Sequence, residues 1–136
     1  MSERVKEWLT ISKEDIEVAQ LCLDGSKFLH CVYMCQQSTE KTMKALIATS
    51  NKIPMPIHNL SQLAMDAAIW DLMQTEQRTF LRILTTYAIE ARYPERRYRL
   101  YQQCDRKEGE RILRSTKELI LWLENQIEQK FSPEKQ

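Results

Sequence analysis

Turn-forming residues are scarce in this chain, which has two glycines and four prolines among 136 residues. So few of them exclude a fold built from many short strands and favour a few long helices. Two glycines also exclude a glycine-rich phosphate-binding loop. No serine lies in the context of a hydrolase nucleophile. The sequence therefore predicts an all-α protein that lacks the commonest nucleotide and hydrolase motifs.

Long apolar runs are also missing, and none approaches the length that crosses a bilayer. The N-terminal stretch MSERVKEWL has no signal-peptide pattern, so a cytoplasmic protein without membrane attachment is expected. The formal net charge is only +1, so any electrostatic attraction to nucleic acid has to be local.

Potential metal ligands are few, with four cysteines and two histidines. Cys31 and Cys35 are four residues apart, but a zinc site wants paired short spacings with further ligands. Disulfides are a poor expectation inside the cell. We expect these thiols to be small buried residues, and we expect no metal and no cofactor.

Helical periodicity predicts a five-helix up-and-down bundle whose first two helices form a long antiparallel pair. Ser12 and Asp15 resemble a capping box and suggest a break or kink in the first helix. Thr75 and Asp105 are candidate N-caps of later helices. Residues 1–131 are expected to form one helical domain, followed by a disordered tail at 132–136. The predicted helices cover about residues 2–23, 28–50, 60–70, 75–91 and 105–131.

The second predicted helix carries an apolar stripe and, beside it, a run of polar residues that we call the polar ladder. Side chains three and four residues apart share a helix face, so the ladder residues lie close together. One interpretation is a solvated face with intrahelical ion pairs. The other is a polar cluster at a seam between helices, directed at a ligand or a second chain. The ladder consists of Gln36, Gln37, Glu40, Lys41 and Lys44.

His58 ends the predicted loop 51–59, just before the third helix. It is either a turn residue whose ring bonds a nearby backbone carbonyl or a group that points at the polar ladder. Histidine suits acid–base work near neutral pH, which keeps the second interpretation of interest.

Residues 92–103 hold four arginines against a single glutamate, interleaved with tyrosines. We expect this stretch to be irregular or only partly helical, because the residue before Pro94 resists helical geometry. Guanidinium groups match phosphate oxygens, and tyrosine rings stack on bases, so the stretch can bind nucleotides or RNA. The alternative is an exposed segment whose arginines only form surface ion pairs.

Four separate pieces of the chain resemble the HEPN domain (higher eukaryotes and prokaryotes nucleotide-binding). They are the run from Cys35 to Lys41, the triplet from Lys44 to Leu46, the triplet from His58 to Leu60, and Tyr87 with the run from Ala91 to Pro94. Their order and spacing both match, and they cover about residues 8–127. The resemblance implies an all-α bundle that is commonly a homodimer.

The resemblance also implies nucleotide binding, of ATP or GTP, and pairing with a minimal nucleotidyltransferase in a toxin–antitoxin-like system. It places the site residues around one pocket or dimer groove. The alternative is a buried polar network that fixes the register of the helices. The implied site residues are Gln37, Glu40, Lys41, Lys44, His58, Tyr87, Arg92 and Tyr93.

Ribonuclease members of the family carry an arginine, four to six residues and then a histidine, and neither histidine here has that arginine. Lys52 has the right spacing to His58 but lacks the bidentate fork. The leading hypothesis is therefore a non-catalytic binding module. A ribonuclease that uses His58 with Lys52 or Arg92 is the alternative, and a plain structural partner protein is the third.

Overall fold

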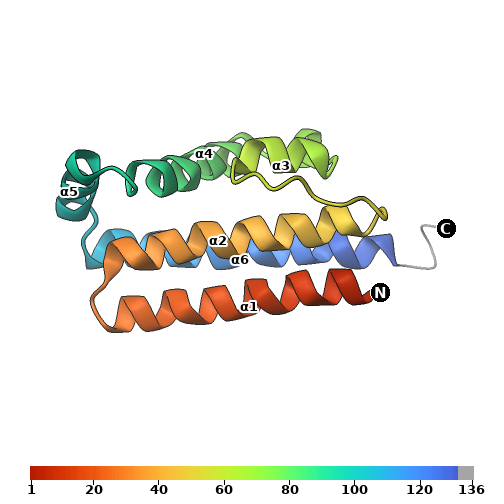
Figure 1. The fold of residues 1–136 in the computed structure, drawn as a ribbon, viewed down its shortest axis with the longest axis horizontal. Helices are drawn as coiled ribbons and strands as arrows, with labels where there is room; N and C mark the ends of the chain where they lie inside the picture. The colour runs from red at the N-terminus through yellow and green to blue at the C-terminus, as the bar shows by residue number, and fades with distance from the viewer. Residues whose placement is uncertain (132–136) are drawn as a thin grey trace.

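The computed structural model describes residues 1–131, and the predicted disordered tail at 132–136 lies outside them. Within the described residues the chain forms six α-helices and one short 3-10 helix (Figure 1). The elements are α1 (Glu3–Asp24), α2 (Phe28–Ala48), α3 (Leu60–Asp66), η1 (Trp70–Leu72), α4 (Thr75–Glu90), α5 (Pro94–Gln103) and α6 (Arg106–Lys130).

The three longest helices lie side by side, with α2 between α1 and α4 in the view of Figure 1 and α6 behind it. α1 and α2 run antiparallel along their full lengths, and the turn that joins them lies at the same end of the molecule as α5. The predicted all-α bundle with a long antiparallel pair is confirmed. It has six helices rather than five in the part of the chain that the structure describes.

α2 is the centre of the bundle, because it packs against every other α-helix in the described chain. Its predicted apolar stripe is buried, including Cys31, Val32, Cys35 and Leu46. The facing stripe of α6 is buried as well. Burying one valine or leucine side chain contributes about 1.5–3 kcal/mol. None of the helices in residues 1–131 combines the length and the hydrophobicity of a membrane span.

Local signals set most helix boundaries. The Ser2 side chain accepts from the backbone N–H of Val5 at the start of α1, and Asp105 accepts from that of Glu108 at the start of α6. Each contact satisfies an N–H that has no partner within its helix. Beyond α2, Asn51 adopts a left-handed backbone conformation with φ of 59°, as expected of a residue that ends a helix.

Three local predictions were wrong. α1 runs without interruption through Ser12, because the Ser12 hydroxyl bonds to a neighbouring helix instead of capping its own. α4 is capped by Gln74, which forms a reciprocal box with Gln77, so Thr75 is its first helical residue. The stretch after Arg92 is helical from Pro94 to Gln103, because proline is well suited to the first position of a helix.

Candidate functional site

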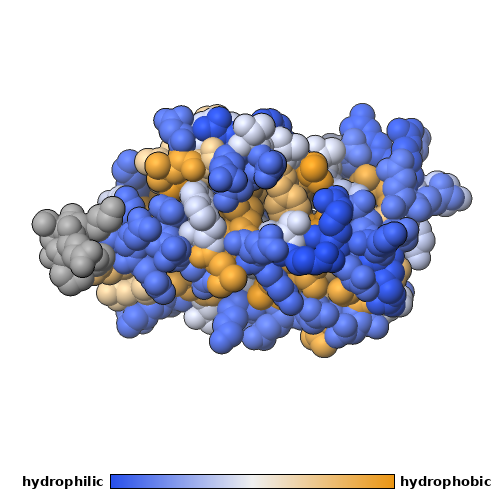
Figure 2. All heavy atoms as spheres, turned by 180° about the vertical axis from the view of Figure 1, so that it is seen from behind, coloured by the Kyte–Doolittle hydropathy of each residue, from blue (hydrophilic) through white to orange (hydrophobic). Residues whose placement is uncertain are grey.

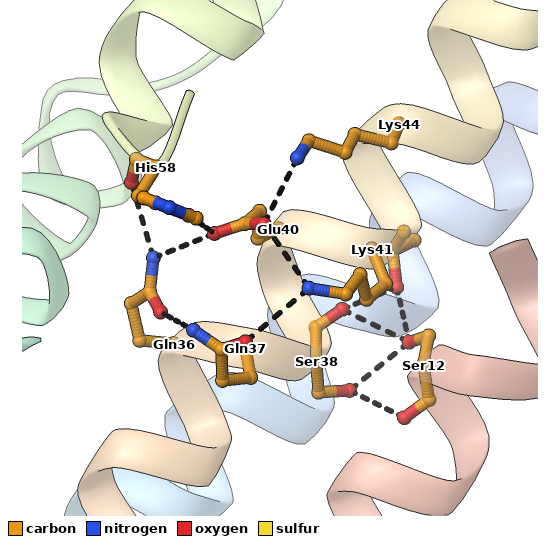
Figure 3. A network of polar contacts seen from close by, with 9 residues as sticks. Ser12, Gln36, Gln37, Ser38, Glu40, Lys41, Lys44 and His58 are labelled. Atoms are coloured by element: carbon orange, nitrogen blue, oxygen red, sulfur yellow. Dashed lines mark hydrogen bonds and ion pairs between the residues drawn. The ribbon is translucent and has the colours of Figure 1, made fainter. Parts of the chain in front are cut away.

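The structure gathers the polar ladder and His58 into one group, which we call the Glu40 cluster (Figure 3). Glu40 is fully buried in the middle of α2 and forms the centre of the group. Its Oε1 atom lies 2.9 Å from Nδ1 of His58 and accepts from Nε2 of Gln36 at 3.3 Å. Its Oε2 atom accepts from Nζ of Lys41 at 3.1 Å and from Nζ of Lys44 at 3.0 Å.

The two glutamines close the cluster. Gln36 is fully buried and also donates to the backbone carbonyl of His58 at 3.1 Å. Its own carbonyl oxygen accepts from Gln37 at 2.7 Å, and the Gln37 oxygen accepts from Lys41 at 3.2 Å. The loop before α3 is therefore attached to α2 through both the ring and the backbone of His58.

The ladder is not a solvated face, which corrects the first of the two interpretations. The Glu40 and Lys44 side chains are 0% and 7% exposed, whereas the His58 ring is 55% exposed. The Lys44 ammonium also lies over the Trp8 ring of α1, 5.6 Å from its centroid. The cluster thus occupies a seam between α1, α2 and the loop before α3, and the His58 ring is its most accessible part.

Glu40 is held as a carboxylate. Burial by itself raises the pKa of this side chain, but hydrogen bonds from His58 and Lys44 and the charge of Lys41 outweigh burial and lower the pKa to about 2. The arrangement of an oriented histidine on a buried carboxylate is one that enzymes use for acid–base chemistry.

A second buried polar contact, which the sequence patterns above did not predict, lies beside the Glu40 cluster. The Ser12 hydroxyl of α1 lies 2.6 Å from that of Thr42 and 3.0 Å from that of Ser38, both on α2. The sequence carries one signal for it. Val5, Ser12 and Ala19 are seven residues apart and all are buried, so Ser12 occupies a core position of α1.

Tyr87 lies apart from the Glu40 cluster, half-buried beside Cys104, which ends α5. Burial is the main reason that its pKa rises to about 12, and the nearby Cys104 and Glu108 add to the effect. Cys104, Cys31 and Cys35 are buried free thiols. In the described part of the chain no three histidine, cysteine or acidic side chains converge as metal ligands do.

Arg92 and Tyr93 lie between α4 and α5, on a basic aromatic area that we call the Arg/Tyr surface. Its tyrosines are exposed, at 54% for Tyr93, 66% for Tyr98 and 58% for Tyr101. Arg96 stacks over the Tyr93 ring, with 5.6 Å between the guanidinium carbon and the ring centroid. The Arg/Tyr surface comprises Arg92, Tyr93, Arg96, Arg97, Tyr98, Arg99 and Tyr101.

Two hollows adjoin the Arg/Tyr surface. The inner one, of about 270 Å³, lies between α2, the end of α4 and the start of α5. The outer one, of about 450 Å³, lies along α5 itself. Arg92 and Arg97 line both hollows. This surface therefore offers fixed positive charge next to apolar and aromatic walls.

The eight predicted site residues thus fall into two places. Gln37, Glu40, Lys41, Lys44 and His58 form one network. Tyr87, Arg92 and Tyr93 lie towards the α5 end of the molecule, where Arg92 faces the first turns of α2. Tyr33 of α2 lines the same hollow as Arg92 and precedes Glu40 by seven residues. The two groups of site residues are therefore separated by about 10 Å along α2. The prediction that one pocket contains both groups is not tested by a single chain. It now requires a groove between two copies of the chain.

A larger groove of about 560 Å³ lies between α4 and α6, on the face where Figure 2 shows apolar residues exposed among hydrophilic ones. Its apolar floor includes Phe80, Ile83 and Leu119, and its polar rim includes Glu76, Arg111 and Glu118. None of the predicted site residues lines this groove.

Similarity to known proteins is found in the fold and in the family. No curated protein matches the chain. Its fold is similar to the crystal structure of TT1696 from Thermus thermophilus, with a TM-score of 0.79 over 92% of this chain and 99% of that one, at 19% sequence identity. The HEPN domain model matches residues 5–126, which include both the Glu40 cluster and the Arg/Tyr surface. The chain therefore belongs to the HEPN domain family.

Proposed function

We propose that this HEPN protein is a binding module that takes a nucleotide ligand at the Arg/Tyr surface and carries out no chemistry of its own. The observation that supports this choice is accessibility. The ladder groups of Glu40 and Lys44 are buried and bonded to one another, whereas Arg92 and Tyr93 are exposed. His58 is exposed as well, but Arg92 and Tyr93 are the exposed guanidinium and phenol ring among the predicted site residues, the groups that suit a phosphate and a base.

In this proposal the Glu40 cluster supports the site rather than forming it. It attaches the loop before α3 to α2, the helix against which α4 and α5 also pack. A buried charged group with every partner in place favours one arrangement of the surrounding helices over others.

Isothermal titration calorimetry with ATP, GTP and a short single-stranded RNA tests the proposal. Saturable binding by the wild-type protein, weakened about tenfold or more in Arg92→Ala, is the expected result. Arg114→Ala is the matched control, because Arg114 is an exposed arginine of α6 that lies outside the Arg/Tyr surface and lines neither hollow. No binding of any of the three ligands would overturn the proposal.

The same proposal includes a homodimer and a nucleotidyltransferase partner, as family membership suggests. Analytical ultracentrifugation is expected to give twice the 16.2 kDa mass of one chain. Where a nucleotidyltransferase gene adjoins this one, co-expression of the two proteins is expected to yield a complex that survives gel filtration. Two separate peaks would remove this partner from the proposal.

A second candidate function, a metal-independent ribonuclease, is favoured by the pairing of Glu40 with His58. Because Nδ1 of the half-exposed ring bonds to Glu40, Nε2 is left for acid–base work. An RNA-cleavage assay in the presence of a chelator decides between the two functions. Cleavage that disappears in His58→Ala supports the ribonuclease, and cleavage that persists in this variant rules out the assignment to His58.

A further inference from the structure

The inner and outer hollows of the Arg/Tyr surface share one pair of side chains. Arg92 and Arg97 line both hollows, so the two side chains lie where the hollows meet. We call this pair of arginines the ridge. Arg92 follows α4 and Arg97 lies in the first half of α5, so the ridge is formed where the chain turns from one helix into the other. Positive charge is therefore placed between two cavities rather than at the end of one.

The inner hollow has the character of a binding site for one flat apolar ring. Leu29 and Ala88 are 4% exposed and, with Ala91, provide apolar walls, while the aromatic residues His30 and Tyr33 also line the hollow. Its volume of about 270 Å³ is below the range of about 300–1,000 Å³ typical of sites for drug-sized ligands. The inner hollow is thus a small site, of a size for one base.

The outer hollow offers a stacking platform. Pro94, Tyr98 and Tyr101 complete its wall beside the two arginines, and both tyrosines are largely exposed. Exposed tyrosines next to arginine are the usual means of holding an unpaired base without reading its identity. A second ring therefore has a place on the far side of the ridge.

We infer that the ligand of the Arg/Tyr surface is a single-stranded oligonucleotide, with the dinucleotide step as its smallest recognised unit. One base enters the inner hollow, the phosphodiester lies on Arg92 and Arg97, and the next base stacks on Tyr98 and Tyr101. The two guanidinium groups supply paired donors for the one phosphate that joins the bases. This inference rests on the proposed function and specifies the ligand of the same site.

A free nucleoside triphosphate fits this arrangement less well. Its phosphates extend from one end of a single nucleoside, so it leaves one of the two hollows empty. The described chain also has no glycine-rich loop to cradle a triphosphate, since its only glycines are Gly25, in the turn after α1, and Gly109, within α6.

Calorimetric titration with the ribodinucleotide ApA, AMP and ATP under identical salt tests the inference. ApA is expected to bind about tenfold or more tightly than AMP and more tightly than ATP, because only ApA fills both hollows. Tyr98→Ala is expected to weaken ApA about tenfold and leave AMP nearly unchanged. Ala91→Met, which narrows the inner hollow, is expected to weaken both ligands.

Two controls separate a loss of ligand contacts from a loss of folding or of general positive charge. Tyr98 is 66% exposed, so its replacement is not expected to disturb the fold, and circular dichroism verifies this. Arg114→Ala removes an exposed arginine of α6 that lies outside the Arg/Tyr surface and lines neither hollow, and it is expected to change ApA affinity less than about twofold at moderate salt.

The possible results distinguish failure of the dinucleotide site from failure of the proposed function. AMP or ATP binding as tightly as ApA, or ApA affinity unchanged in Tyr98→Ala, would overturn the dinucleotide site and leave a mononucleotide site in place. Absence of binding by every nucleotide would overturn the proposed function and this inference with it.

Discussion

Nδ1 of His58 lies 2.9 Å from Oε1 of Glu40, so a half-exposed ring on the loop before α3 bonds to a fully buried carboxylate in the middle of α2. The two residues are 18 positions apart in the chain. The backbone carbonyl of His58 is bonded to α2 at the same time, through Gln36. This double attachment makes the loop part of the bundle.

Removing the Glu40 carboxylate is expected to destabilise the protein strongly. In Glu40→Ala the Lys44 ammonium stays nearly buried and loses the carboxylate it bonds, and unpairing a buried charge costs about 3–5 kcal/mol. Urea denaturation measures this as a loss in the free energy of unfolding. Glu17→Ala, at an exposed position of α1, is the control and is expected to stay within about 0.5 kcal/mol. Equal losses in the two variants would contradict a structural role for the cluster.

The same carboxylate predicts a loss of stability in acid. The Glu40 pKa is lowered from 4.5 to about 2 in the folded protein, so its contribution is complete above about pH 4.5 and is lost as the pH falls towards 2. Each pH unit across that window removes up to about 1.4 kcal/mol. The measurement is the free energy of unfolding from about pH 6 to about pH 2.5 for the wild type and Glu40→Gln.

In that comparison, other carboxylates titrate in both proteins, so the difference between the two curves reports Glu40. The difference is expected to shrink steadily below about pH 4.5. A difference that stays constant throughout the acid range would show that the Glu40 carboxylate does not contribute in this way.

The buried hydroxyl of Ser12 is expected to contribute modestly to the pairing of α1 with α2. Ser12→Ala removes the partner of the Thr42 and Ser38 hydroxyls, but each of these keeps a bond to a backbone carbonyl. The expected cost is therefore about 1 kcal/mol, as for one net hydrogen bond. Urea denaturation checks it against Thr10→Ala, whose exposed hydroxyl bonds only to a carbonyl of its own helix. A Ser12→Ala protein as stable as the control would contradict the prediction.

Tyr87 is expected to ionise late in an alkaline titration. Its pKa is raised to about 12, mainly by burial, so the phenolate absorbance that it contributes is expected to appear only near pH 12 or when the protein unfolds. The measurement is the difference between ultraviolet titrations of the wild type and Tyr87→Phe. A component that titrates near the ordinary tyrosine pKa of about 10 in the folded protein would show that Tyr87 is exposed to solvent.

Short-range patterns were sufficient for most of the architecture. The seam residues of α2 and α6 follow a helical period, and the side chains of Ser2 and Asp105 mark helix starts through contacts three residues away. Such signals act within one turn of helix and can be read from the chain directly. The proximity of Gln37, Glu40, Lys41 and Lys44 follows from the same rule.

Wrong predictions arose where local signals competed. Serine and aspartate three residues apart are typical of a capping box, and only the burial of Ser12 against α2 excludes a cap there. The residue before a proline resists helical geometry, yet Pro94 itself begins a helix. In both cases the residue type allows two conformations, and the surrounding packing selects one.

The sequence by itself determined the helical class, the long antiparallel pair, and the family to which the chain belongs, because these depend on periodicity, caps and the spacing of motifs. Only the tertiary structure decided that Glu40 is buried as a carboxylate, that His58 completes its bonding, and that Arg92 and Arg97 share two hollows. Burial and contact between distant segments depend on how the helices pack against one another, and no pattern within a single helix specifies that arrangement.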